Sequence, residues 1–308
     1  MQGHIYCIFT EEMEKKDFKS GFVNIIGNAN VGKSTLMNKL IGERLSIITS
    51  KAQTTRHRIL GIVNDENYQI VFSDTPGIIQ PNYNLQTSMM KFVRSAFQDA
   101  DLFLFMVEIG EKSLKDSSFF ERLKNSDIPI LLLINKIDKS NHKGVEKAIT
   151  HWESQLPKAK IIPISAIEGF GVDKIMSEIT AMLPIGNPYF PTDALTDKPE
   201  RFFVSEIIRE KILLNYQKEI PYSVEVVIET FKEEDEIIQI EAIINVERET
   251  QKGIIIGHKG KALKKVGTHA RKDLETFFGK KIFIKLFVKV MNNWRDNKQD
   301  LKRFGYFT

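Results

Sequence analysis

The segment Gly27–Ser34 carries residue types at a spacing that can bind phosphate. Its sequence, Gly-Asn-Ala-Asn-Val-Gly-Lys-Ser, matches the pattern G-x4-G-K-[ST] and lies between an apolar run typical of a strand and a helix-like stretch. The glycines let backbone N–H groups point at phosphate oxygens, and the helix adds its positive end. Lys33 would reach the β- and γ-phosphates, and the Ser34 hydroxyl would bind Mg²⁺. The alternative is a chance glycine turn, which would not explain this context.

Two further segments can complete a metal and phosphate site. Asp74-Thr-Pro-Gly77 ends a strand candidate, so its aspartate can hold Mg²⁺ through water and Gly77 can offer its N–H to the γ-phosphate. The Thr54-Thr55 pair precedes the second strand, and a threonine there can close over Mg²⁺; we favour Thr55. Alone, each segment could be an ordinary turn. Because they accompany a phosphate loop, they predict a metal site of Ser34, Thr55 and Asp74.

Two segments at the ends of later strands predict recognition of guanine. Asn135-Lys-Ile-Asp138 places Asp138 where its carboxylate can accept hydrogen bonds from guanine N1–H and the 2-amino group. Adenine lacks both donors, so a carboxylate facing it would stay unpaired and ATP would be rejected. Ser165-Ala-Ile167 can place the N–H of Ala166 against guanine O6. Either segment alone could be a polar turn, but their order and spacing indicate guanine specificity.

The predicted nucleotide contacts come from motifs that lie far apart in the chain. They are Gly27, Asn30, Gly32, Lys33, Ser34, Thr35, Asp74, Gly77, Asn135, Lys136, Asp138, Ser165 and Ala166. Ras-like enzymes orient the attacking water with a glutamine just after Asp-x-x-Gly, but here Ile78 and Ile79 follow Gly77. We therefore expect slow hydrolysis of GTP to GDP, with Lys33 and Thr55 as catalytic groups and the missing element supplied otherwise.

Gly257-His-Lys-Gly260 is a second candidate site, of a different kind. A G-x-x-G loop between two helices can clamp about four nucleotides of backbone, with donors here from His258 and Lys259. The motif occurs often by chance, but the apolar run before it and the lysines around it agree with this interpretation. We predict binding of single-stranded nucleic acid. The predicted contacts are Gly257, His258, Lys259, Gly260, Lys261, Lys264 and Lys265.

Apolar runs that alternate with helical stretches predict an α/β fold with a doubly wound, mostly parallel sheet. The expected strands are 22–26, 59–63, 69–73, 102–107, 129–134 and 160–164, and the expected helices between them are 84–98, 113–126, 142–155 and 172–183. A smaller α+β domain follows, with helices 201–216, 259–278 and 292–303 and strands 222–231, 237–246 and 281–290. Prolines mark a linker between the two. The predicted parts are a tail at 1–17, a nucleotide-binding domain at 18–183, a linker at 184–199 and the smaller domain at 200–308.

Charge is distributed unevenly along the chain. Residues 250–308 carry 15 lysines and arginines against 4 acidic residues, whereas residues 200–249 carry 6 against 13. A basic region attracts phosphate backbones, although a solvated basic face would look the same. Cys7 is the only cysteine, which excludes an internal disulfide and a cysteine-cluster zinc site and fits a reducing cytosol. No run of about 18 apolar residues is present, so we expect no membrane span.

These motifs together resemble the Era family of GTPases, and the segment Lys51-Ala-Gln-Thr-Thr-Arg-His-Arg58 is especially similar. The resemblance covers about residues 20–308. It departs from the family at Ala29, where proline is usual, which should alter loop stiffness more than ligation. The tail has no counterpart. The resemblance implies a type II KH domain that binds the 3′ end of 16S rRNA and a role in assembly and maturation of the 30S subunit.

The resemblance also implies a role for Asn30. In relatives with asparagine at this place of the phosphate loop, the side-chain oxygen binds K⁺, which offsets charge on the phosphates as an arginine finger would. Asn30 is therefore a third catalytic candidate, and K⁺ a candidate cofactor beside GTP, GDP and Mg²⁺. The alternative is that Asn30 only braces the loop.

Other functions fit the sequence less well. A tRNA-modifying GTPase of the same group carries a C-terminal cysteine that Cys7 cannot replace, and a tandem GTPase needs a second phosphate loop. The protein could also be an RNA-binding module whose nucleotide site is only structural, but the presence of Lys33, Asp74 and Asp138 argues against this. We expect a cytoplasmic protein that does not bind DNA. The basic tail Lys298–Arg303 leaves peripheral attachment to the inner face of the cell membrane open, and Trp294 before it is expected to pack rather than bind.

Overall fold

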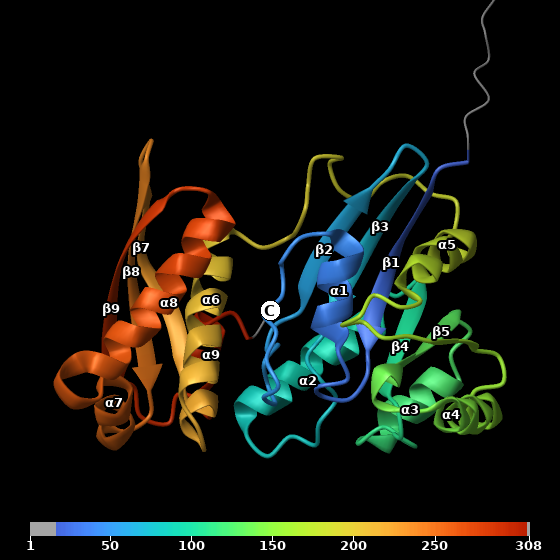
Figure 1. Ribbon diagram of the computed structural model, residues 1–308, viewed down its shortest axis with the longest axis horizontal. Helices are drawn as coiled ribbons and strands as arrows, with labels where there is room; N and C mark the ends of the chain where they lie inside the picture. Colours follow the sequence, from blue (N-terminus) through green and yellow to red (C-terminus); the bar gives the residue numbers. More distant parts are fainter. Residues whose placement is uncertain (1–16, 307–308) are drawn as a thin grey trace, which may run out of the picture.

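The computed structural model describes residues 17–306 and contains two sheets, each with its own helices (Figure 1). The predicted tail at 1–17, apart from Asp17, and Cys7 lie outside the described residues. The two sheets confirm the predicted fold class, a mostly parallel α/β domain followed by a smaller α+β domain. No helix among residues 17–306 is long and apolar enough to cross a membrane.

The first sheet has six strands in the order β2-β3-β1-β4-β5-β6. Only β2 and β3 pair antiparallel; the other pairs are parallel. The residues of β5, and nearly all of β4, are buried, because helices cover both faces and favour continuous apolar runs. The strands are β1 (Lys19–Ile26), β2 (Ile59–Asn64), β3 (Tyr68–Asp74), β4 (Leu102–Glu108), β5 (Ile130–Asn135) and β6 (Lys160–Pro163).

Five helices cover this sheet. Side chains of α1 (Lys33–Ile41) and α5 (Val172–Met182) pack into one apolar cluster on one face. Side chains of α2 (Asn84–Ala96), α3 (Ser117–Lys124) and α4 (His142–Gln155) pack into a second cluster on the other face. The carboxyl ends of the parallel strands therefore share one edge, where the loops that carry the predicted nucleotide motifs meet.

The second sheet has three strands in the order β7-β8-β9, with β7 antiparallel and β9 parallel to β8. Helices α6 and α8 pack on one of its faces and bury an apolar cluster. The strands are β7 (Glu225–Glu233), β8 (Ile237–Val246) and β9 (Lys281–Val290). The helices are α6 (Glu200–Asn215), α7 (Glu249–Ile256), α8 (Lys261–Phe278) and the C-terminal α9 (Lys298–Arg303). Short 3₁₀ turns cover Ile137–Lys139, Ile220–Tyr222 and His258–Gly260.

Residues 184–197 form an ordered strap along the first sheet. The carbonyl of Leu195 accepts a hydrogen bond from Ile62 N of the edge strand β2 at 2.8 Å, which covers an edge that would otherwise be open. The buried side chain of Gln69 in β3 accepts one from Tyr189 N at 2.7 Å. The proline-rich segment is thus held against the first domain almost to the start of α6.

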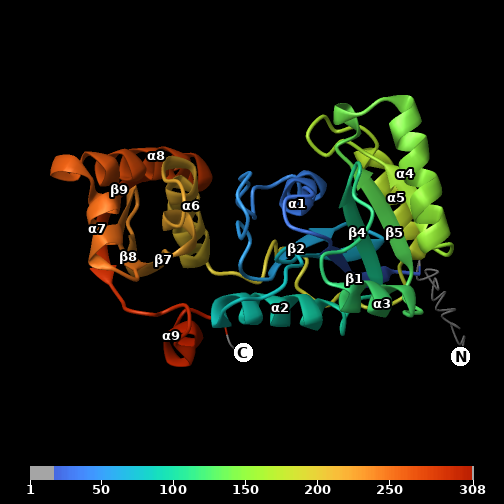
Figure 2. The same ribbon diagram turned by 90° about the horizontal axis from the view of Figure 1, so that it is seen from below.

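The C-terminal residues 291–306 return from the second domain to the first. Trp294 is fully buried, packs into the cluster around α2, and donates its indole N–H to Ser223 O at 3.1 Å. Arg295 O accepts a hydrogen bond from Leu85 N of α2 at 2.9 Å. Figure 2 shows α9 beside the end of α2, seen from below. Trp294 is therefore a packing residue, as expected.

Several predicted helices are shorter in the structure; the one expected over 113–126, for example, forms only over Ser117–Lys124. Two of these helices are shortened at a left-handed residue. The helix expected over 292–303 forms only as α9, because Asn293 adopts φ 54° and interrupts the turn before it. The helix expected over 259–278 begins at Lys261, because Lys259 has φ 49° and ψ 33°. Both breaks depend on single non-glycine residues in the left-handed region, which periodicity of apolar residues does not reveal.

Candidate nucleotide site and RNA-binding loop

The phosphate loop lies between β1 and α1 and requires its glycines. Gly27 and Gly32 have φ 154° and 106°. A Cβ atom on Gly27 would lie 2.1 Å from Met106 O, and one on Gly32 would lie 2.4 Å from Asn135 Nδ2. The neighbouring strands therefore leave no room for side chains at these places, so the backbone can curl toward a ligand.

Lys33 is buried at the base of this loop. Its ammonium donates to Gly27 O at 3.2 Å and Asn28 O at 2.8 Å. Burial lowers the pKa of Lys33 to about 8, and the charge of Asp74 works against the lowering. A buried ammonium that bonds only to carbonyls is a cation without a full counter-charge, which suits the binding of phosphate.

Oxygen atoms from three motifs meet where α1 begins. Ser34 Oγ donates to Asp74 Oδ2 at 2.6 Å and lies 2.9 Å from Thr55 Oγ1. Thr55 Oγ1 also lies 3.4 Å from Asp74 Oδ2. Thr54 is directed elsewhere, since its hydroxyl donates to Lys51 O at 2.6 Å. Thr55 rather than Thr54 is thus in the cluster.

The cluster fits Mg²⁺. Asp74 Oδ1 is buried without a hydrogen-bond partner among the described residues. Burial raises the pKa of the Asp74 carboxyl, while the hydrogen bond from Ser34 and the charge of Lys33 lower it. One carboxylate and two hydroxyls are oxygen ligands, which Mg²⁺ prefers together with water and phosphate. Ser34 and Thr55 would hold the ion directly and Asp74 through water.

The guanine motifs are joined to the phosphate loop by Asn135. Its Nδ2 donates to Val31 O at 2.7 Å, and its Oδ1 accepts from Ala166 N at 2.8 Å. Asp138 Oδ1 accepts from Ser165 Oγ at 2.6 Å, which orients the carboxylate. The N–H of Ala166, expected to face guanine O6, is instead used by Asn135, because that amide ties the loops together.

A cavity opens between the phosphate loop and the segment that contains Thr55, and several of the predicted contacts line it. Lys136 has φ 64° and donates from Nζ to Asn30 O at 2.7 Å. Gly77 approaches the phosphate loop so closely that a Cβ on it would lie 2.4 Å from Ala29 Cα. The predicted residues that line the cavity are Asn30, Gly32, Lys33, Ser34, Thr35, Thr55, Gly77 and Lys136.

The G-x-x-G loop joins α7 and α8 beside strand β9. Gly257 has φ 69°, and a Cβ there would lie 2.6 Å from the Ala262 side chain, so glycine is required. His258 and Lys259 are exposed at the tip. A groove runs from the loop between α8 and β9, lined by Gly260, Leu263, Lys264, Gly267, Thr268, Arg271, Ile282, Phe283, Ile284 and Leu286.

Sequence reasoning placed only part of this groove. Of the predicted RNA contacts, Gly260 and Lys264 line the groove, while Lys261 and Lys265 are exposed beside it. Arg271, which is not among the predicted contacts, also lines the groove, because it lies two turns beyond Lys264 on the same face of α8. The contribution of β9 could not be foreseen without the sheet order.

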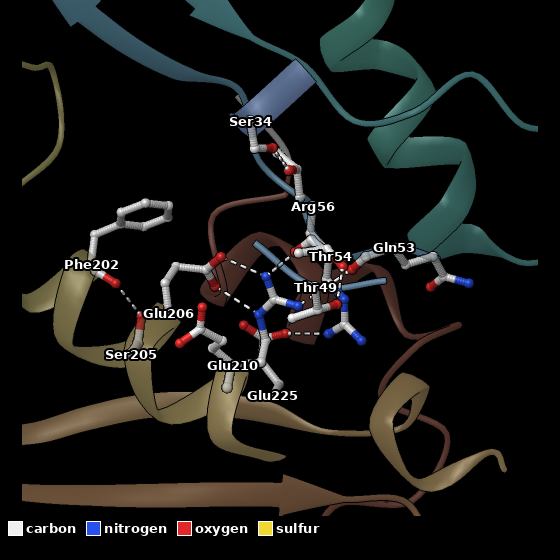
Figure 3. Close-up of polar contacts among 12 residues, drawn as sticks. Ser34, Thr49, Gln53, Thr54, Arg56, Phe202, Ser205, Glu206, Glu210 and Glu225 are labelled. Atoms are coloured by element: carbon white, nitrogen blue, oxygen red, sulfur yellow. Dashed lines mark hydrogen bonds and ion pairs between the residues drawn. The ribbon is translucent and has the colours of Figure 1, made fainter. Parts of the chain in front are cut away.

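A buried polar network connects the two domains beside the nucleotide site, and sequence reasoning missed it (Figure 3). Arg209 of α6 donates to the carbonyls of Thr54 and Gln53, the latter at 3.4 Å, and pairs with Glu206. Its guanidinium is almost fully buried. The helix that opens the second domain therefore holds the backbone just before Thr55.

A second arginine reaches in the opposite direction. Arg56, fully buried, donates to Val224 O at 2.7 Å and pairs with Glu225 at 3.0 Å, both in the second domain. Beside it His57 stacks on Tyr306 with ring centroids 4.3 Å apart. Burial and the charge of Arg209 lower the pKa of His57 to about 3, so the ring is neutral at physiological pH. Each domain thus supplies an arginine that the other satisfies.

Replacing Asp138 with asparagine should change the preferred base. Asparagine keeps one acceptor and adds a donor, so it mismatches guanine but can donate to the 2-oxo group of xanthine. We expect Asp138→Asn to weaken GTP binding by about 10²- to 10⁴-fold and to favour XTP. Titration with both nucleotides measures this, with the exposed Asp173→Asn on α5 as control. Unchanged GTP affinity would remove Asp138 from base recognition.

Comparison with known proteins assigns a family to each of the two domains. The model of the 50S ribosome-binding GTPase family matches residues 22–136, and that of the KH domain matches residues 219–295. GTPase Era of Geotalea uraniireducens strain Rf4 is 46% identical over 96% of this chain and 100% of its own length.

Solved structures give the same answer. A crystal structure of Era with MgGDPNP and nucleotides 1506–1542 of 16S ribosomal RNA has a TM-score of 0.89 and 39% identity, covering 94% of this chain and 99% of its own. A single-residue variant of Aquifex aeolicus Era bound to GDP and AlF4⁻ gives a TM-score of 0.90, with the same identity and coverage. A single relative that aligns from end to end with both domains settles the family. The chain belongs to the Era family of GTPases.

Proposed function

We propose that this protein is a GTP-hydrolysing switch that binds the 3′ end of 16S rRNA through its KH groove and acts in maturation of the 30S subunit. The observation that carries this proposal is the contact of Arg209 with the carbonyls before Thr55, because it joins the nucleotide site to the RNA-binding domain. The solved relative that holds both a GTP analogue and this RNA segment supports the target.

The nucleotide side of the switch follows from the site geometry. The loop glycines admit the phosphates, and Lys33 offsets charge on the β- and γ-oxygens as it grows during phosphoryl transfer. Mg²⁺, when bound, would add positive charge at Ser34 and Thr55. Thr55 already lies beside Ser34 and Asp74. In this proposal the γ-phosphate and Mg²⁺ stabilise its segment there, and the loss of the γ-phosphate is transmitted through the Thr54 carbonyl to Arg209. Ile78 is fully buried and cannot orient water, so intrinsic hydrolysis is slow.

Potassium supplies the missing catalytic charge in this proposal. Asn30 has φ 66°, and its Nδ2 donates to Ser50 O at 2.9 Å. Using the nitrogen in this bond leaves the side-chain oxygen to ligate a cation beside the phosphates. Ser50 lies in the segment that closes over the nucleotide, so one side chain can both brace the loop and complete the cation site.

Asn30→Ala should remove the response to K⁺. We expect wild type to hydrolyse GTP faster in KCl than in NaCl at equal ionic strength, and Asn30→Ala to hydrolyse at one low rate in both. Phosphate release under single-turnover conditions measures this, and Asn67→Ala in an exposed turn is the control. Equal wild-type rates in the two salts would refute the role of K⁺.

The Arg209 contact should couple nucleotide state to RNA affinity. We expect the wild-type Kd for 3′-end RNA to differ between the GDPNP and GDP forms by about 5- to 150-fold, the usual range of coupling. Arg209→Met with Glu206→Gln leaves no buried charge unpaired and should bring the two Kd values together. Lys232→Ala, at an exposed ion pair in the second domain, is the control. If the two Kd values still differ in the double variant, the coupling does not depend on the Arg209 contact.

The assigned target can be tested in cells. Crosslinking the protein to RNA and sequencing the recovered fragments should give reads concentrated at the 3′ end of 16S rRNA, and His258→Asp with Lys259→Asp should remove them. Reads on transfer RNAs or messenger RNAs would contradict the proposed rRNA target and would not affect the assignment of GTPase activity. Fractionation of the same cells places the protein in the cytoplasm, as we propose, or at the inner face of the membrane through its basic tail.

A further inference from the structure

Strand β9 presents an alternation of lysine and phenylalanine on one face. Its sequence is Lys-Ile-Phe-Ile-Lys-Leu-Phe-Val-Lys-Val. The even-numbered residues belong to the apolar cluster under α6 and α8, so the odd-numbered ones point to the opposite face of the sheet. That outer stripe consists of Lys281, Phe283, Lys285, Phe287 and Lys289, and all five are exposed.

The two phenylalanines of the stripe are unusually open. Phe283 is 47% exposed and Phe287 is 52% exposed, although both lie in the middle of a regular strand. They are four residues apart, so their rings are separated by about 13 Å and serve two ligand groups rather than one. β9 is the edge strand of its sheet and lies on the side of the molecule away from the first domain (Figure 1).

The lysines make the stripe positive. Lys285 pairs with Glu241 of β8 at 2.9 Å, and its ammonium lies 5.5 Å from the centre of the Phe283 ring, which it helps to orient. Among the described residues, no ion pair is formed by Lys281 or Lys289. Two unpaired cations beside two open aromatic rings complement a chain that alternates flat apolar groups with negative charges.

The stripe is continuous with the G-x-x-G groove. Phe283 lines that groove as well as the outer face, whereas Phe287 lies further along β9 and does not line it. A strand of RNA held by Gly260 and Lys264 would therefore pass Phe283 at the rim. The next exposed aromatic side chain along β9 is Phe287.

We propose that the outer face of β9 is a second RNA-binding surface, on which single-stranded RNA leaving the groove stacks bases on Phe283 and Phe287 while Lys281 and Lys289 contact its phosphates. This inference rests on the proposed RNA binding of the groove and extends it. Stacking on aromatic side chains with a basic track beside them is how open sheets bind single strands without base-specific hydrogen bonds. An apolar protein partner fits less well, because every second position of the stripe is a lysine.

The test compares two RNA lengths with one variant. An RNA of about four nucleotides fills only the G-x-x-G groove. An unstructured RNA of about twelve nucleotides also reaches the stripe. Phe287→Ala should leave the affinity for the short RNA unchanged and weaken the long RNA by roughly fivefold to a hundredfold. Leu214→Ala, at an equally exposed apolar side chain on α6, is the matched control.

Two further variants report contact directly. Lys281→Ala with Lys289→Ala should reduce the salt dependence of long-RNA binding by about 1.4 in logarithmic slope, while Lys143→Ala with Lys147→Ala on α4 should not. Phe287→Trp should keep the long-RNA affinity and show a fluorescence change on binding. Trp152 and Trp294 are fully buried and remain in every variant, so wild type titrated with the same RNA gives the background change to subtract.

The two proposals fail in different ways. If Phe287→Ala and Phe287→Trp bind long RNA like wild type, with no fluorescence change, the stripe is not an RNA surface, and a protein partner becomes its better explanation. If His258→Asp with Lys259→Asp binds the short RNA like wild type, the groove proposal fails instead. Equal melting temperatures of all variants exclude loss of the fold as a cause.

Discussion

The arrangement of the whole molecule depends on a buried guanidinium. Arg209 cannot lie in an apolar interior without acceptors, and it finds them in two places, the carboxylate of Glu206 on its own helix and the carbonyls of the segment before Thr55. Removing one partner of such a buried pair costs about 3–5 kcal/mol, far more than an exposed ion pair is worth. The position of the nucleotide-sensing segment is therefore part of the stability of the second domain.

Much of the nucleotide site could be predicted from the sequence because its chemistry is local. A phosphate loop works through consecutive backbone N–H groups, so its requirements appear as glycines at fixed spacing within Gly27–Ser34. The parallel strands can be recognised in the sequence as apolar runs, and the carboxyl ends of parallel strands lie at the same edge of the sheet. The choice of Thr55 over Thr54 was a preference that the sequence alone could not decide, and the structure places the Thr55 hydroxyl beside Ser34 and Asp74. Ala166 shows the limit, because its N–H is used by Asn135, a residue 31 positions away.

The contacts between domains could not be predicted, because nothing local marks them. Arg209 and Thr54 are 155 residues apart, and Arg56 and Glu225 are 169 apart. In the sequence each arginine looks like any other charged residue, and only the packing shows that it is buried and where its acceptors lie. The stripe on β9 is an intermediate case. The sequence shows that two sets of residues alternate along the strand, but only the position of α8 shows which set faces outward.

Besides the buried arginine contacts, the chain itself joins the second domain to the first at two separated places. The strap holds the chain to β2 up to the start of α6, and the C-terminal segment returns to α2 through Arg295 and Trp294. If the arginine contacts rearrange, a domain still held at these two points keeps mainly rotation about the line that joins them. A small rearrangement near Thr55 then rotates the second domain about this axis. The G-x-x-G loop lies away from the axis, so it moves along an arc that is longer the further the loop is from the axis.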